Sequence, residues 1–189
     1  DSEVFYELAG VLWKKRECKE ASAIYRIALC LSERSEKYAG AYFRACRWVK
    51  LTEEGLSMLR RRFERFGDSS GSPAITLAGA LRALDQDDEV SELLEDALKR
   101  SPSDGELISY AANFFAGIRK VEKAQALVEQ AKGKISEVER WRVLARIAEL
   151  DSDPAESLRY WRKINELEPL AMDAHRAMVG FLHETTGSD

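Results

Sequence analysis

A short pattern of residue sizes recurs along this chain at a nearly constant interval, and that interval restricts the fold more than any other feature. The pattern is a small residue, a large residue four positions later, and a usually small residue three positions beyond that. It starts at positions 21, 55, 90, 124 and 157, in steps of 34, 35, 34 and 33 residues. Adjacent core pairs that begin at positions 8, 42, 77, 111, 144 and 178 keep the same interval. Two sets of positions with one period indicate a structural unit that is repeated through the whole chain.

Each unit is predicted to be a pair of α-helices. Apolar residues recur at i, i+3, i+4 and i+7 in every long segment, and no segment alternates with period two. Prolines stand at the expected boundaries. Pro154 follows Asp153 as in a capped helix start, and Pro102 and Pro169 follow the ends of second helices. The predicted fold class is therefore all-α.

The period and the pattern resemble those of the tetratricopeptide repeat (TPR) family. The clearest unit begins at Trp141, continues through Leu144 and Ala145 to Trp161, and closes at Pro169. The resemblance covers essentially the whole chain and implies a right-handed superhelical solenoid of antiparallel helix pairs, with about five and a half repeats. We expect a single TPR-like solenoid over residues 1–189, with repeats at about 2–35, 36–69, 71–104, 105–137 and 138–171 and a further first helix at 172–184.

The repeat at 36–69 departs most from the family pattern. It has bulky Tyr42 and Phe43 where a small second member is usual, and Arg62 replaces a small residue. We still expect a helix pair there. The Gly- and Ser-rich stretch at 67–73 predicts the loosest connection in the chain.

The two ends of the chain are predicted to be uncovered. The chain begins without methionine and its sixth unit has a first helix only, so we interpret it as a fragment of a longer protein. Apolar stripes without a neighbour favour further repeats or self-association through the uncapped ends.

The resemblance also implies a concave groove lined by three positions of each first helix. Of eighteen such positions, six are arginine and only Glu149 is acidic, although the chain as a whole has a formal net charge of −4. Arginine suits carboxylate capture because its planar fork makes two parallel hydrogen bonds. The predicted anion contacts are Arg44, Arg47, Arg82, Arg142, Arg146 and Arg176. In the alternative interpretation these arginines are solvated, or pair with acids on adjacent helices. Four acids one turn earlier could also neutralise the rim of the groove, namely Glu3, Glu106, Glu139 and Asp173.

Three further groove residues are candidate contacts. Tyr6 and Trp13 could stack on an apolar anchor of a peptide, or contact a preceding repeat. Asn113 is an isolated amide in the groove. One subclass of the family binds the acidic tails of chaperones with Lys and Asn over three successive repeats, and no three repeats here supply that set.

These observations predict a protein–protein interaction scaffold that binds an extended, acidic partner segment. An alternative is a substrate-docking or assembly arm of a larger enzyme or export machine, such as a glycosyltransferase or a polysaccharide-secretion system. No GxxxxGK[ST], GxGxxG or GxSxG motif is present, so we predict no enzyme activity and no cofactor. His175 and His183 have no further ligands at metal-binding spacing.

Other classes of partner find little support in the sequence. The basic cluster Arg60, Arg61, Arg62 and Arg65 is short and lies among glutamates, which does not favour nucleic acid. No apolar run has the length needed to span a membrane. The odd cysteine count favours free thiols and a reducing compartment such as the cytoplasm, with Cys30 and Cys46 expected in the core.

Overall fold

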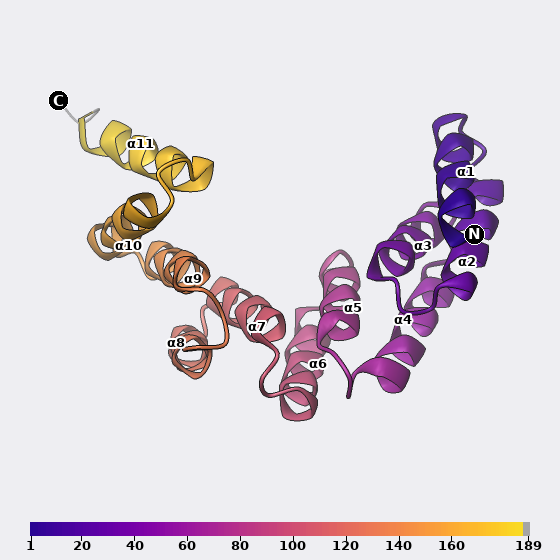
Figure 1. Ribbon diagram of the computed structural model, residues 1–189, viewed down its shortest axis with the longest axis horizontal. Helices are drawn as coiled ribbons and strands as arrows, with labels where there is room; N and C mark the ends of the chain where they lie inside the picture. Colours follow the sequence, from indigo (N-terminus) through magenta and orange to yellow (C-terminus); the bar gives the residue numbers. More distant parts are fainter. Residues whose placement is uncertain (187–189) are drawn as a thin grey trace. The chain divides into compact units, whose positions relative to one another are not determined.

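The computed structural model describes residues 1–186, and all regular structure in that range is helical (Figure 1). The helices are α1 (Ser2–Lys14), α2 (Cys18–Leu31), α3 (Glu36–Trp48), α4 (Thr52–Phe66), α5 (Ser72–Arg82), α6 (Asp87–Arg100), α7 (Gly105–Gly117), α8 (Val121–Gln130), α9 (Glu137–Leu150), α10 (Pro154–Leu167) and α11 (Met172–Thr186). The prediction of an all-α fold built from helix pairs is confirmed.

The turn inside each helix pair has the same conformation in all five pairs. One residue in each turn has a positive φ, between 58° and 67°, and none of the five is glycine; they are Arg16, Lys50, Asp85, Arg119 and Ser152. The next residue donates its backbone N–H to a carbonyl five positions earlier, as Glu17 does to Leu12 and Leu51 does to Cys46. This bond satisfies a carbonyl at the end of the first helix and reverses the chain within three or four residues.

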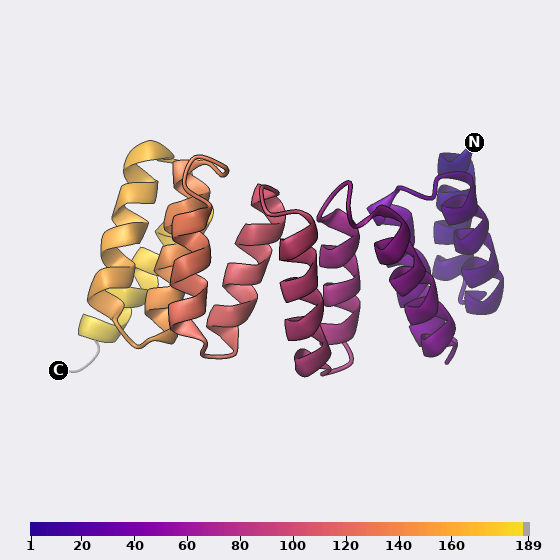
Figure 2. The ribbon, with the colours of Figure 1, turned by 90° about the horizontal axis from the view of Figure 1, so that it is seen from below.

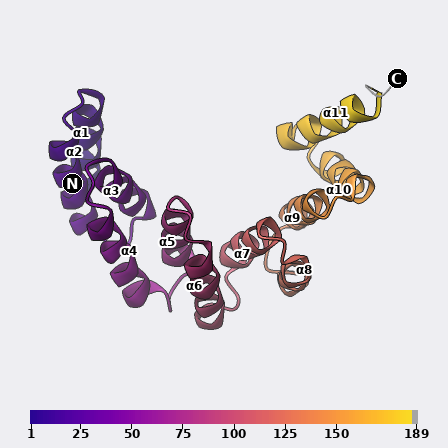
Figure 3. The same cartoon turned by 180° about the vertical axis from the view of Figure 1, so that it is seen from behind.

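The chain divides into two compact units, and the division lies between Pro102 and Ser103. Unit 1 contains α1 to α6, and unit 2 contains α7 to α11. Within unit 1, α3 packs on α5, and the paired helices α5 and α6 lie side by side (Figure 2). Within unit 2, α7, α9 and α11 follow one another along one side, while α8 and α10 lie on the other side (Figures 1 and 3).

The repeated small positions of the second helices lie in the core. Ala21, Val90, Ala124 and Ser157 are at most 4% exposed, and Gly55 is also buried. The second member of each first-helix pair is buried as well, from Ala9 to Ala145. In α11 the corresponding Val179 is 53% exposed. Small side chains at these positions let neighbouring helices approach closely, which explains the period seen in the sequence.

Arg62, the most unusual residue of the second repeat, is buried between α3 and α4. Its guanidinium donates to both carboxylate oxygens of Glu36, over 3.0 and 2.8 Å, and its Nε donates to the backbone oxygen of Glu33 over 2.8 Å. The side chain is only 5% exposed. The charge therefore enters the core with its hydrogen-bonding capacity largely satisfied.

Two local expectations differ from the structure. The stretch at 67–73, expected to be the loosest connection, is held by Ser101 Oγ, which donates to the backbone oxygen of Gly67 over 3.1 Å, and by hydrogen bonds between Ser70 and Ser72. The compact units separate elsewhere. Among the cysteines, Cys46 is buried as expected, but Cys30 is exposed on α2.

Candidate partner-binding site

Two adjoining cavities lie along α11 in unit 2, the first lined mainly by α9 and α11 and the second mainly by α10 and α11. The first, which we name the arginine cavity, measures about 420 Å³ and has polar walls formed by Asn113, Glu139, Arg142, Arg146, Asp173 and Arg176. The second, which we name the apolar cavity, measures about 520 Å³ and is lined by Pro154, Ser157, Leu158, Gly180 and Phe181. Both are bounded by Glu149, Trp161 and Ala177, so they meet at these residues.

The arginine cavity brings together four of the residues that the sequence singled out. Arg142 and Arg146 stand one turn apart on α9, Asn113 comes from α7, and Arg176 comes from α11. Residues four apart share one face of a helix, so the two α9 arginines point to the same side. The Nδ2 group of Asn113 donates to the backbone oxygen of Ser109 over 2.9 Å, which fixes the orientation of the amide.

Arg142 is engaged in an ion-pair network that ties α9 to the start of α11. Its Nε donates to Asp173 over 2.7 Å, and another guanidinium nitrogen donates to Glu168 over 2.8 Å. Glu139 lies 3.9 Å away. The hydrogen bond from Arg142 lowers the pKa of Asp173, and the bond to Asp173 raises the pKa of Arg142. For Arg142, the interpretation in which the groove arginines pair with acids on adjacent helices is therefore the better one, because its two short contacts lie outside α9.

Arg146 and Arg176 differ from Arg142 because they make no ion pair within residues 1–186. Both side chains are exposed, and they line the cavity from opposite helices. The cavity wall carries as many carboxylates as arginines. Two of the acids, Glu139 and Asp173, gather around Arg142, so positive charge without an ion-pair partner is left at Arg146 and Arg176.

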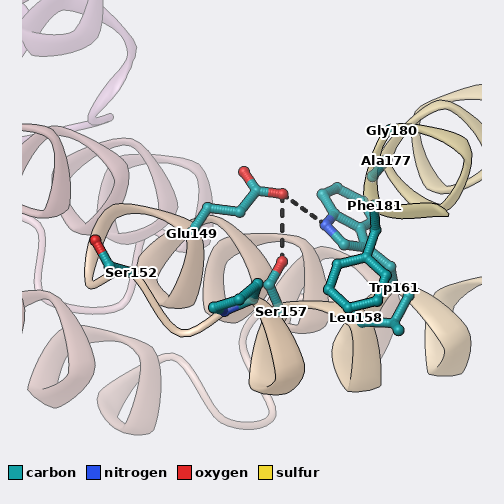
Figure 4. A pocket seen from close by; sticks show the side chains of 9 residues that line it. Glu149, Ser152, Ser157, Leu158, Trp161, Ala177, Gly180 and Phe181 are labelled. Atoms are coloured by element: carbon teal, nitrogen blue, oxygen red, sulfur yellow. Dashed lines mark hydrogen bonds between the residues drawn. The ribbon is translucent and has the colours of Figure 1, made fainter. Parts of the chain in front are cut away.

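Trp161 lines both cavities and is held in place from two sides. Its indole Nε1 donates to Glu149 Oε1 over 2.8 Å, and Ser157 Oγ lies 3.3 Å from the same oxygen (Figure 4). The ring also packs against the buried cluster of Ile164 and Ala174. In the sequence, Trp161 served only as a marker of the repeat, because nothing there shows that its N–H reaches Glu149.

The other predicted arginines belong to unit 1. Arg44 and Arg47 are exposed on α3 and make no ion pair within residues 1–186. Arg82 is exposed on α5. The nine candidate residues are thus divided between the two units, and the four in the arginine cavity form one local constellation.

Tyr6 and Trp13 both contact aromatic residues inside unit 1. The ring centroid of Tyr6 lies 5.5 Å from that of Tyr25 and 5.1 Å from that of Tyr38. Trp13 meets Trp48 edge to face, with 5.9 Å between their centroids. Trp48 is 62% exposed, so this pair presents an aromatic surface that the sequence analysis did not single out.

The outer basic cluster borders a further cavity of about 400 Å³, to which Arg61, Arg62 and Arg65 contribute. In the outer basic cluster, Arg60 pairs with Glu89 and Arg65 pairs with Glu33, while Arg62 is buried. Among the described residues, no group of three or more His, Cys, Asp and Glu side chains is placed to hold a metal ion. In the same part of the chain, no helix is long and apolar enough to cross a membrane.

Comparison with known proteins identifies the fold. No protein-family model and no curated protein matches the sequence. Among solved structures, TTC0263, a thermophilic TPR protein in Thermus thermophilus, is 17% identical with a TM-score of 0.67, covering 96% of this chain and 99% of that one. YrrB, described as a TPR protein with an unusual peptide-binding site, is 17% identical with a TM-score of 0.57, covering 94% and 92%. PilW, described as a type IV pilus biogenesis factor, is 16% identical with a TM-score of 0.64, covering 98% and 86%.

These similarities show that the chain has the fold of the tetratricopeptide repeat proteins. Because the sequence identities are this low, the similarities establish the fold and not a function. The function has to be argued from the residues of this chain.

Proposed function

We propose that this protein is an interaction scaffold that binds an extended, acidic segment of a protein partner, and that the arginine cavity of unit 2 holds an acidic side chain of that segment. The observation that carries the proposal is the pair Arg146 and Arg176, which line one cavity from opposite helices without ion-pair partners in residues 1–186. YrrB, which has the same fold, is described as having a peptide-binding site.

The chemistry of the cavity suits a carboxylate. A guanidinium presents several donors in a fixed plane and can bind both oxygens of one carboxylate. Two guanidinium groups on facing helices can therefore donate hydrogen bonds to a single acidic side chain from both sides. Arg142 plays a different part, because its network with Asp173 and Glu168 holds the cavity wall.

Unit 1 contains the other three arginines of the predicted groove. Arg44 and Arg47 on α3 and Arg82 on α5 are all exposed. We propose that they meet additional acidic residues of an extended partner. These contacts add affinity to the binding at the arginine cavity and are not required for it.

The proposal is tested with peptides and charge reversal. Random 12-residue peptides displayed on phage are selected on the purified protein, and enriched sequences are made with a fluorescent label. Binding is then measured by fluorescence anisotropy at two salt concentrations. The doubly substituted Arg146→Glu, Arg176→Glu protein should bind acidic peptides at least about tenfold more weakly, with a smaller salt dependence.

A matched control comes from the same unit. Arg162 on α10 and Lys132 are exposed basic residues that do not line the cavity, so the doubly substituted Arg162→Glu, Lys132→Glu protein makes the same charge change elsewhere. It should leave peptide binding nearly unchanged. Equal losses in the control and the Arg146→Glu, Arg176→Glu protein would show that only net charge matters. Selected peptides without acidic residues would reject the proposal.

The alternative, an assembly arm of a larger enzyme or export machine, stands as a second proposal. PilW, a structure of the same fold, is described as a type IV pilus biogenesis factor. In that case the cavity would hold a segment of the same machine. A catalytic or membrane-spanning region in the sequence that flanks this chain would favour it.

A further inference from the structure

The two cavities along α11 are adjacent but chemically different. Arg146 and Arg176 line the arginine cavity. The apolar cavity has largely apolar walls that include Pro154, and its Leu158 and Phe181 are seen with Trp161 in Figure 4. Trp161, which lines both cavities, is fixed by its hydrogen bond to Glu149. A ligand long enough to occupy both cavities would therefore meet a cationic compartment and an apolar compartment in a fixed order.

Glu149 sets the electrostatic boundary between the compartments. Among the described residues, it is the only charged one that lines the apolar cavity. Its Oε1 accepts from Trp161 and Ser157, which orients the carboxylate at the junction. A second acidic group of the ligand would be repelled at this point, whereas an uncharged side chain would not. The junction thus favours an apolar side chain beyond Trp161.

The spacing of the compartments matches a short stretch of extended peptide. Arg176 and Gly180 line the two cavities from the same face of α11. Four helical residues rise roughly 6 Å. In an extended chain, residues two apart point to the same side and lie about 7 Å from each other. An acidic residue and an apolar residue at positions i and i+2 could therefore occupy the two compartments together.

We propose that the cleft formed by α9, α10 and α11 is a two-part recognition site for a peptide segment in which a large apolar side chain stands about two residues from an acidic one. The acidic side chain binds at Arg146 and Arg176, and the apolar side chain enters the apolar cavity beyond Trp161. This inference rests on the proposed function and adds the feature that selects among acidic partners.

Gly180 allows the apolar compartment to be closed without disturbing the fold. A Cβ atom at Gly180 would meet no atom within 4 Å, although the residue lines the cavity. In Gly180→Leu the new side chain should fill part of the cavity. Gly117 at the end of α7 is also exposed with nothing within 4 Å of an added Cβ, and it lines neither cavity. Gly117→Leu is therefore the matched control.

The experiment uses the selected acidic peptides and, for each, a partner in which the apolar residue is replaced by serine. For the unmodified protein, the apolar peptide should bind about tenfold more tightly than its serine partner, since a Leu-sized side chain leaves water. Gly180→Leu should abolish this difference, because the apolar side chain of the peptide can no longer enter the filled cavity. Gly117→Leu should keep the difference. Circular dichroism checks that both variants fold.

The outcomes separate this inference from the proposed function. Acidic peptides that bind through Arg146 and Arg176 but show no apolar preference would overturn the two-part site alone. Absence of any acid-dependent binding would overturn both. Static light scattering completes the test. If the protein self-associates and Gly180→Leu dissociates it, a second copy occupies the apolar cavity and the inference is wrong.

Discussion

Phe43 on α3 and Gly55 on α4 compensate for each other in the second repeat. A Cβ atom added to Gly55 would lie 3.1 Å from Cδ2 of Phe43 and 3.0 Å from Cβ of Cys46. Phe43 is 4% exposed and fills the position that holds alanine in the other four complete repeats. The large side chain on one helix thus fits because the facing helix has no side chain at all.

Gly55→Ala should therefore destabilise the protein, although alanine is the better helix former. Both neighbouring atoms belong to buried residues that cannot move freely, so overpacking should cost about 1–3 kcal/mol. That cost exceeds the gain in helix propensity of about 1 kcal/mol. Denaturant unfolding followed by circular dichroism measures the difference in unfolding free energy.

A second glycine and a second variant control this prediction. Gly79 on α5 is exposed and an added Cβ meets nothing within 4 Å, so Gly79→Ala should stabilise by roughly 0.5–1 kcal/mol. In a Phe43→Leu background the cost of Gly55→Ala should shrink, because the facing side chain is smaller. The same cost in both backgrounds would show that Phe43 is not the cause.

Truncation of the Arg62 side chain should cause a large loss of stability. In Arg62→Ala the carboxylate of Glu36 and the backbone oxygen of Glu33 lose their buried partner, which should cost roughly 3 kcal/mol. Arg65 also pairs with Glu33, but its side chain is 65% exposed, so Arg65→Ala should cost less than about 1 kcal/mol. Urea unfolding curves extrapolated to water give both free energies of unfolding. Similar values for the two variants would show that burial does not determine the contribution.

The turns between paired helices should respond to glycine in a position-specific way. Arg16 has φ 67° and is exposed, so Arg16→Gly should relieve left-handed strain and raise stability by roughly 0.5–1 kcal/mol. The neighbouring Lys15 has φ −77°, so Lys15→Gly should lower stability by a similar amount. Both variants remove one positive charge. Thermal unfolding should shift in opposite directions, and equal shifts would refute the explanation by backbone strain.

The sequence predicted those parts of the fold that depend on residue size at fixed intervals. Small positions such as Ala21 and Ala124 are buried as the period requires, and the helix pairs follow the predicted register. The turn conformation was not predictable from residue type, because Arg16 and Lys50 are not residues that favour positive φ. The pairing of Phe43 with Gly55 did leave a signal, since both depart from the family pattern within one repeat.

The candidate site was predictable only as a set of positions on the first helices. The register places Arg142, Arg146 and Arg176 on the groove face, and the structure shows all three lining one cavity. Which arginine lacks an ion-pair partner depends on side-chain positions between helices. The apolar cavity was missed because Trp161 and Phe181 come from different helices, and their approach depends on how α10 and α11 pack.

The last prediction concerns acid and the contact between α9 and α11. The hydrogen bond from Arg142 holds the pKa of Asp173 below its ordinary value of 3.8. A carboxyl group whose pKa is lowered by folding contributes stability that is fully present above the unfolded value and is lost as the pH falls through the folded value. Asp173→Asn should therefore lower stability at pH 7 and pH 5 equally, and the gap should close below pH 3.8. Because the Asp173 side chain is 45% exposed, the difference in unfolding free energy between the two proteins should not exceed about 1 kcal/mol at low salt.

Urea unfolding at each pH measures this difference, with Glu166→Gln as a control that removes an exposed acid outside this network. A gap for Asp173→Asn that stays constant down to pH 2 would show that the ion pair with Arg142 does not stabilise the fold.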